Sequence, residues 1–520
     1  MSRAGTLAST AVLGFSTLMS RCAGLVRDIV IATMFGAGFG TDAFFIAFTI
    51  PNLLRRFFAE GSLTAAFVPV FSGVREKEGQ DGAVRVARQC WSLLILVMAA
   101  VTATGILCAP WIVNLVGHGF GSIAGKMSLT IELTRIMFPY IFFVSLLALV
   151  TGILNVYGHF FIPALTPVLL NLSIICSALV FSSDFVVPIE ALAWGVLVGG
   201  VLQLVVTVPV LKRYGFTLRP VWRMDHPAVK RIAVLMLPGI LGVAIYQINM
   251  VVTRLLASFL EQGSVSYLYY SQRMFEFPQG VFIVSLAQAL LPGMSKYAAA
   301  HQESKLLDSL EHALSLIFIV TIPAALGLAL CAEALFSQLF MRGAFTYEDV
   351  SHTALALIAY APGLVFVGIS RVIVPLFHAW EDTRTPVHVS FWTLLVNAGG
   401  GLVLMQYYSY LGLAAALSLA SLFNALVLFV LMRRNLGRNL NLAPLGGVLF
   451  KVCAASMVMG VAVYAVLQYG EWEQGFNLPN TLCLGSAVAG GIAVYTLTAV
   501  CLRLNEITEI GAMLKRKIRH

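Results

Sequence analysis

The sequence predicts an all-α, polytopic membrane protein, and three observations support this fold class. Of its 520 residues, 59% are hydrophobic and only 11% are charged, whereas soluble domains carry about 25% charged residues. Apolar runs of about 20 residues, long enough to cross roughly 30 Å of hydrocarbon, occur about fourteen times. Two segments recur after about 220 residues, which predicts two six-helix lobes in parallel repeat around a central cavity, followed by two C-terminal helices.

The apolar runs give the expected membrane-spanning helices in order. The first run passes directly into the next and lacks the layout of a signal peptide, so we expect its helix to be retained. Several runs contain proline, for example Pro51, Pro139, Pro278 and Pro362, so kinks are expected. The runs lie near residues 7–35, 40–71, 91–117, 129–157, 160–183, 188–211, 232–260, 265–295, 309–340, 350–378, 387–408, 410–432, 446–468 and 480–502.

Lysine and arginine are concentrated in alternate loops, which predicts the orientation of the helices. The opposite loops hold only Lys126 and Arg342. Both termini are therefore expected in the cytoplasm, and the formal charge of +9 reflects this topology rather than a nucleic-acid partner. The basic side holds Arg75, Lys77, Arg85 and Arg88 after the second run, Lys212, Arg213, Arg219, Arg223, Lys230 and Arg231 after the sixth, and Arg503, Lys515, Arg516, Lys517 and Arg519 in the C-terminal tail.

Two pairs of segments form the internal repeat. Residues 139–157 match residues 362–380 at an offset of 223, and each segment starts with proline and ends with an aromatic residue. Residues 191–213 match residues 412–434 at an offset of 221. Six helices per unit is an even number, so both copies insert with the same orientation. The expected domains are an N-terminal lobe (1–222), a C-terminal lobe (223–440), and a helix pair with a basic cytoplasmic tail (441–520).

Charged residues are concentrated in the first two apolar runs. An arginine at the centre of a spanning helix costs roughly 2.5 to 3.5 kcal/mol, so these side chains are expected to face protein or water and to mark a substrate or ion path. A structural alternative pairs Arg56 with Glu60 at i and i+4 and anchors Arg21 and Arg27 at the headgroups. The charged residues are Arg21, Arg27, Asp28, Asp42, Arg55, Arg56 and Glu60.

The second lobe contributes Arg273 and Glu276, with Arg254 and Arg371 as further candidates. Arginine suits phosphate because its planar guanidinium stays charged and binds two oxygens at once. The alternative for Arg273 and Glu276 is a pair at i and i+3 that neutralises itself. Other polar residues in the runs are Asn171, Asn249 and Asn397, expected as interhelical hydrogen-bond partners, and His378 with Asp382, which are either structural or a proton or cation relay.

The segment around these charges resembles a known family. The run FGAGFGTDAFFIAFTIPNLLRRFFAEGSLTAAFVP follows SRCAGLVRD, and together they resemble the N-terminal signature of the MviN/MurJ family of lipid II flippases. This family is a branch of the multidrug, oligosaccharidyl-lipid and polysaccharide exporters. The resemblance implies a transporter rather than an enzyme. It would translocate the peptidoglycan precursor lipid II from the inner to the outer leaflet of the bacterial cytoplasmic membrane by alternating access.

The resemblance also implies roles for individual residues. The substrate-binding residues expected from it are Arg21, Arg27, Asp42, Arg55, Arg56 and Arg273, whose arginines would capture the diphosphate. The supporting residues expected are Asp28, Glu60, Ser266 and Glu276. In the family, the last two spans are understood to extend a hydrophobic groove from the bilayer into the cleft.

No cofactor or metal is expected, because the eight cysteines form no CxxC motif and no cluster with histidine. Some members of the resembled family bind sodium through an acidic residue in the seventh span. Residues 232–260 contain no Asp or Glu, so such a site is not expected here. Membrane potential acting on the arginines is the other source of energy, at about 2.3 kcal/mol per charge and 100 mV. Expected partners are lipid II, membrane lipids, and cell-wall synthesis and division proteins.

Three alternatives to a lipid II flippase stay open. The first is an exporter of another polyprenyl-diphosphate-linked oligosaccharide, or of cationic drugs, although the arginine excess fits drugs poorly. The second is a membrane-embedded enzyme acting on such lipids, but the sequence has no DDxxD, HExxH or P-loop motif. The third is a scaffold for a cell-wall or division complex, which would not explain so many arginines inside the spans.

Overall fold

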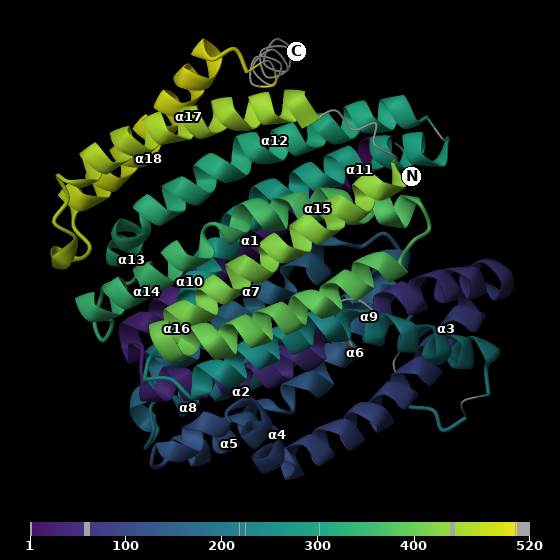
Figure 1. Cartoon of the computed structure of the whole chain (residues 1–520). Coiled ribbons are helices and arrows are strands. Elements are labelled where there is room, and N and C mark those ends of the chain that lie inside the picture. The colour runs from purple at the N-terminus through teal and green to yellow at the C-terminus, as the bar shows by residue number, and fades with distance from the viewer. Residues whose placement is uncertain are drawn as a thin grey trace. The chain divides into compact units, whose positions relative to one another are not determined.

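The chain forms helices joined by short turns and loops in the part that the computed structural model describes, residues 3–56, 63–217, 219–223, 225–300, 302–436, 442–504 and 506. Within these ranges every regular element is a helix, which confirms the predicted all-α fold class (Figure 1). The chain divides into two compact units, Met1–Val265 and Ser266–His520. Each unit has its own apolar core.

The core of the first unit lies where α3 packs against α6 and α9. The rings of Phe67 and Phe71 stack with centroids 4.7 Å apart. Gly152 lies against Phe67, and an added Cβ would come within 2.9 Å of its ring, so glycine permits this close approach. The helices are α1 (Arg3–Phe35), α2 (Phe39–Arg55), α3 (Leu63–Leu107), α4 (Ala109–Val116), α5 (Lys126–Met137), α6 (Tyr140–Val156), α7 (Phe161–Cys176), α8 (Glu190–Arg213) and α9 (Pro227–Ser258), with short 3-10 helices η2 (His118–Ser122) and η4 (Ser182–Asp184) and a short π-helix η3 (Ser177–Phe181).

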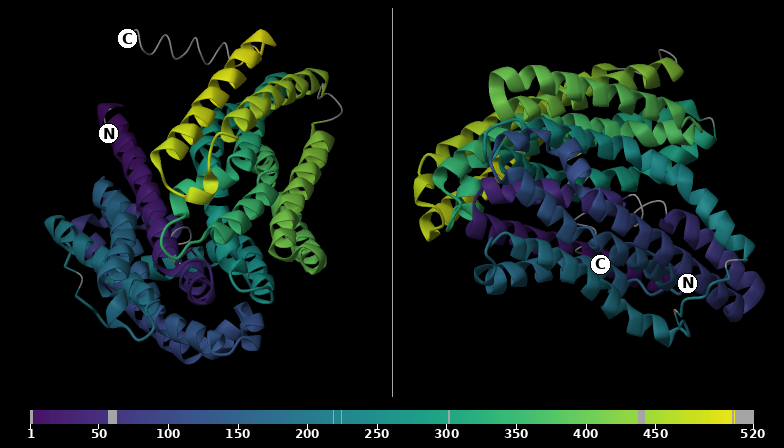
Figure 2. Two further views of the ribbon diagram at one scale, coloured as in Figure 1. Left: turned by 90° about the vertical axis from the view of Figure 1, so that its left-hand side faces the viewer. Right: turned by 90° about the horizontal axis from the view of Figure 1, so that it is seen from below.

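The core of the second unit includes the contact of α12 with the hairpin of α17 and α18. These two C-terminal helices run side by side (yellow in Figures 1 and 2). Tyr495 of α18 donates a hydrogen bond of 2.8 Å to the carbonyl of Ile319 in α12. The helices are α10 (Ser264–Pro278), α11 (Val284–Ala299), α12 (Glu303–Leu330), α13 (Ala332–Phe340), α14 (Tyr347–Tyr360), α15 (Gly363–Ala379), α16 (Arg384–Asn435), α17 (Leu442–Leu467) and α18 (Leu478–Cys501), with a short π-helix η5 (Gln279–Ile283) and a short 3-10 helix η7 (Trp472–Gln474).

Two long helices are broken where the sequence predicts a loop. At 1.5 Å per residue, the 52 residues of α16 would extend about 78 Å, far more than the roughly 30 Å of hydrocarbon. Ser409, which separates the predicted runs 387–408 and 410–432, has a φ of 50° and breaks the helix there. The 45-residue α3 breaks in the same way at Gly79, with a φ of 71°. The predicted boundary at residue 409 is therefore confirmed.

The described residues contain nine helices long and apolar enough to span a membrane, or ten if the bent pair α14 and α15 is one span. The count includes α16 once, although this helix covers two predicted runs, so it is consistent with about fourteen spans. The exact number of spans stays a prediction. The repeated segments fold alike, because α6 and α15 are each 17 residues long and each follow a proline. The first compact unit includes α9, which the predicted division placed in the second lobe.

Candidate functional site

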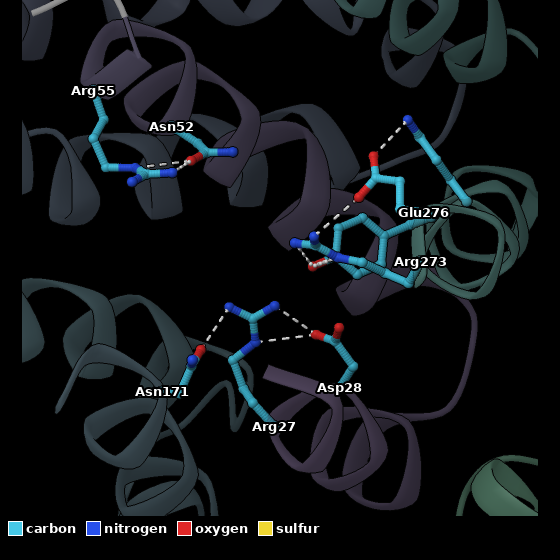
Figure 3. A network of polar contacts seen from close by, with 9 residues as sticks. Arg27, Asp28, Asn52, Arg55, Asn171, Arg273 and Glu276 are labelled. Atoms are coloured by element: carbon cyan, nitrogen blue, oxygen red, sulfur yellow. Dashed lines mark hydrogen bonds and ion pairs between the residues drawn. The ribbon is translucent and has the colours of Figure 1, made fainter. Parts of the chain in front are cut away.

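Arg27 and Asp28 form a buried pair near the end of α1. Their exposed fractions are 6% and 2%. Arg27 donates through Nε and Nη2 to Asp28 Oδ1, at 3.0 and 2.6 Å, and through Nη1 to Asn171 Oδ1 at 3.1 Å. Figure 3 shows the guanidinium between these two acceptors. A buried charge is tolerated when it is paired and hydrogen-bonded, so the guanidinium is held in one orientation.

Asn171 connects α7 to α1. Its Nδ2 donates to the carbonyl of Ser20 at 3.4 Å while its Oδ1 accepts from Arg27. Gly24 lies on the same face of α1, and a Cβ there would be 3.8 Å from Asn171 Nδ2. The prediction that Asn171 is an interhelical hydrogen-bond partner is confirmed. Its partner is the buried arginine, a relationship that the sequence did not indicate.

Arg55 and Arg56 lie at the C-terminal end of α2, and both are half-buried. Arg55 donates through Nε and Nη2 to Asn52 Oδ1, at 3.1 and 3.0 Å (Figure 3). Glu60 lies outside the described residues, so the predicted pairing of Arg56 with Glu60 stays a prediction. Arg21, on α1, has an exposed side chain.

Asp42 lies in the first turn of α2 and is buried with Lys126. Lys126 Nζ donates to Asp42 Oδ2 at 2.9 Å, and both side chains are 1% exposed. The same oxygen accepts from the backbone N–H of Gly263 at 2.7 Å. The ammonium also lies 4.3 Å from the centroid of the Phe120 ring, a cation–π contact. The sequence placed Lys126 in an outward loop, and the structure instead buries it at the first residue of α5.

Arg254 and Ser266 are also buried. Arg254, on α9, is 5% exposed and donates through Nη1 to the carbonyl of Val265 at 3.1 Å. This bond ties α9 to the start of α10 within the first unit. Ser266 has no exposed surface. Arg371, the other arginine considered, is exposed on α15.

Arg273 and Glu276 form the pair at i and i+3 that the sequence offered as an alternative. Arg273 Nη1 lies 3.4 Å from Glu276 Oε2, and the side chains are 35% and 34% exposed. Arg273 also donates to Tyr269 Oη, at 3.0 Å through Nη2 and 3.3 Å through Nε. Gln272 Nε2 donates to Glu276 Oε1 at 3.2 Å. Since a pair this exposed is screened by solvent, its arginine stays accessible to an anionic ligand.

Asp382 has a structural role at the start of α16. Its Oδ1 accepts from the backbone N–H groups of Arg384 and Thr385, at 3.1 and 3.0 Å. Hydrogen bonds from the Thr385 side chain and backbone hold the pKa of Asp382 below its ordinary value. His378 is exposed. Among the described residues, no group of three or more His, Cys, Asp or Glu side chains could hold a metal ion.

The sequence comparisons point to one family. A sequence profile described as lipid II flippase MurJ matches residues 31–483. A lipid II flippase MurJ of Burkholderia cenocepacia is 38% identical over 430 residues, covering 81% of this chain and 83% of that protein. A probable lipid II flippase MurJ of Vibrio cholerae is 35% identical over 520 residues, covering 97% and 98%.

Solved structures agree with the sequence comparisons. A lipid II flippase MurJ in an inward closed conformation has a TM-score of 0.79 and 27% identity, covering 96% of this chain and all of that one. An inward-facing MATE family multidrug transporter of the MOP superfamily has a TM-score of 0.66 at 17% identity, covering 80% of this chain and 94% of that one. The second similarity concerns the fold alone.

Proposed function

The chain belongs to the lipid II flippase MurJ family, and we propose that it translocates lipid II from the inner to the outer leaflet of the bacterial cytoplasmic membrane. Lipid II carries its disaccharide-peptide on an undecaprenyl diphosphate. The tail can stay in lipid, but the charged head must cross a medium of low dielectric constant. A polar path with fixed cationic groups lowers that barrier.

The observation that carries the proposal is the buried Arg27 guanidinium, fixed by Asp28 and Asn171. Its charge is permanent, and its fork matches two phosphate oxygens. Because the protein has already ordered this side chain, a diphosphate would lose less entropy on binding. The diphosphate would either share the Arg27 guanidinium with the Asp28 carboxylate or replace that carboxylate as its hydrogen-bond acceptor.

The other residues expected from the resemblance belong to this proposal. We assign phosphate binding to Arg21, Arg27, Arg55, Arg56 and Arg273, and supporting roles to Asp28, Glu60, Ser266 and Glu276. Asp42 differs, because its buried carboxylate already binds Lys126 and Gly263. A carboxylate repels a diphosphate, so we assign Asp42 a positioning role in place of the direct contact expected from the resemblance.

The proposal includes transport by alternating access, with both termini in the cytoplasm as the distribution of lysine and arginine favours. It also includes contacts with cell-wall synthesis and division proteins through loops or the membrane face. A second candidate substrate is another polyprenyl-diphosphate-linked oligosaccharide, because it offers the same diphosphate to Arg27. The family match favours lipid II.

The test uses the purified full chain in liposomes that contain fluorescent lipid II. We expect faster movement between leaflets than in protein-free liposomes, and movement at the protein-free rate with Arg27→Gln. No acceleration by the wild-type chain would contradict the proposal. Acceleration of another polyprenyl-diphosphate glycan, but not of lipid II, would establish the second candidate.

A further inference from the structure

The first unit contains an open pocket of about 1150 Å³, and none of its lining residues belongs to the Arg27 site. It lies between α3, just after its break at Gly79, and the segment that joins α8 to α9. We call it the α3–α9 pocket and define it by the lining residues Arg85, Arg88, Trp222, Arg223, Asp225 and His226. Its volume exceeds the space that inorganic phosphate needs and suits a phosphate attached to an organic group.

The walls of the α3–α9 pocket are fixed by hydrogen bonds between residues far apart in the sequence. Gln80 Nε2 donates to the carbonyl of Tyr214 at 2.9 Å, and the N–H of Val221 donates to Ser92 Oγ at 2.7 Å. The N–H of His226 donates to Gln89 Oε1 at 3.1 Å. The segment is thus attached to α3 at Tyr214, Val221 and His226, and these bonds fix the walls of the pocket there.

Three guanidinium groups line this pocket. Arg88 donates through Nε to the carbonyl of Thr217 at 2.9 Å, and through Nη2 to the hydroxyl of the same residue. Arg85 and Arg223 make no hydrogen bond or close ion pair with any residue in the described part of the chain. A planar fork with uncommitted N–H donors is the arrangement that binds phosphate oxygens.

Two carboxylates also line the pocket, so its charge must be counted. Arg85, Arg88 and Arg223 against Asp81 and Asp225 leave one net positive charge. Asp225 accepts a hydrogen bond of 2.8 Å from Gln89 Nε2. This bond, its own backbone N–H, and nearby Arg223 and Arg85 hold the pKa of Asp225 below its ordinary value. Asp225 therefore stays ionised and offsets part of the arginine charge.

Trp222 adds an aromatic surface beside the arginines. Its side chain is 82% exposed, in a loop with a high content of arginine that the sequence places on the cytoplasmic side. Tryptophan favours the headgroup region of a membrane, and basic pockets on the cytoplasmic side attract anionic lipid headgroups. The same ring could stack on the organic part of a soluble phosphate compound.

We propose that the α3–α9 pocket binds the phosphate group of an anionic ligand, through Arg85 and Arg223, at a site separate from Arg27. The phosphate belongs either to a lipid headgroup or to a soluble phosphate compound. The proposal goes beyond the flippase activity, because it uses none of the residues assigned to lipid II.

The test measures binding to the purified full chain in detergent by calorimetry. The lipid probes are dioctanoyl phosphatidylglycerol and, as the zwitterionic control, dioctanoyl phosphatidylcholine. The soluble probes are inorganic phosphate and ADP. The double variant Arg85→Gln/Arg223→Gln should weaken the binding of the preferred anionic probe by about tenfold or more, as expected for the loss of charge-assisted hydrogen bonds.

Two further variants make the test specific. Arg219→Gln removes the same charge from the same loop but not from the pocket lining, and should change the affinity less than about twofold. Asp225→Asn keeps an acceptor for Gln89 but removes a repulsive charge, so it should strengthen binding. Preference for phosphatidylglycerol would identify a lipid ligand, and preference for ADP or phosphate a soluble one. The proposal is overturned if no anionic probe distinguishes the double variant from Arg219→Gln.

Discussion

Lys126 and Asp42 form an ion pair of 2.9 Å in which each side chain is 1% exposed. The pair joins the first residue of α5 to the first turn of α2, and the N–H of Gly263 donates to the same carboxylate oxygen. Burying two charges is costly unless each compensates the other. The pair therefore fixes these three segments of the first unit relative to one another.

Replacing Lys126 by methionine should destabilise the protein strongly. The variant leaves Asp42 buried without its cation, a change that costs about 3 to 5 kcal/mol. The measurement is the thermal unfolding midpoint of the purified chain, with Lys296→Met as a control because Lys296 is exposed. Equal midpoints for the two variants would contradict the structural role.

A second substitution at this pair separates positioning from substrate contact. The double variant Lys126→Met/Asp42→Asn removes both charges and should recover much of the lost stability. If Asp42 only positions helices, lipid II movement in liposomes should recover along with the midpoint. A stable double variant that does not transport would instead favour direct contact between Asp42 and the substrate.

Asn171→Ala should reduce transport while leaving the chain folded. It removes the acceptor of Arg27 Nη1, and a hydrogen bond to a charged group is worth about 1.5 to 3 kcal/mol. We expect lipid II movement to fall about tenfold. Asn171→Asp should reduce it further, because a second carboxylate would neutralise the arginine. Wild-type transport by Asn171→Asp would show that the charge of Arg27 is not used.

Substitutions of Asp382 distinguish a role in capping α16 from a role in a proton relay. Asp382→Asn keeps an acceptor for the N–H groups of Arg384 and Thr385, so stability and transport should both be retained. Asp382→Ala removes the cap and should cost about 1 kcal/mol. Loss of transport in Asp382→Asn, measured in the same liposomes, would support the relay.

The stability of the segment joining α8 to α9 should depend on pH through Asp225. The pKa of Asp225 in the folded chain is lowered from its ordinary value of 3.8. The stability that its ionised carboxylate gives to the folded segment is therefore fully present above pH 3.8 and is lost as the pH falls through the folded pKa. Hydrogen exchange of residues 219–223 and 225–226 measures this loss. The wild-type chain should be better protected than Asp225→Asn above about pH 5, and equal to it well below about pH 4. The two proteins differ only at residue 225, so their difference isolates Asp225; a difference that persists in acid would contradict the assignment.

Periodicity and composition predicted the helices of the chain better than they predicted the contacts between side chains. The helical class, the boundary at Ser409 and the interhelical bond of Asn171 follow from apolar runs and from a polar residue inside one. The burial of Lys126 does not follow, because a single lysine beside a glycine is typical of a solvated loop. Its partners Asp42 and Phe120 are brought to it only by the tertiary fold.

The α3–α9 pocket was missed for a similar reason. Its lining residues come from two segments far apart in the sequence, between Gln80 and Gln89 and between Gly215 and Pro227, so no local pattern indicates it. The arginines on both sides of the pocket are visible in the sequence, but arginines in such loops indicate membrane topology rather than a binding site. Arg273 with Glu276 illustrates the same limit, because the spacing predicted their ion pair but not the contact with Tyr269.

The most direct test of the account is the accessibility of lipid II in cells depleted of this protein. Lipid II in the outer leaflet is measured with an externally added enzyme that cleaves it. We expect depletion to abolish cleavage, wild type and Arg75→Gln to restore it, and Arg27→Gln to fail although it reaches the membrane at the same level. Unchanged cleavage after depletion, or full restoration by Arg27→Gln, would contradict the account.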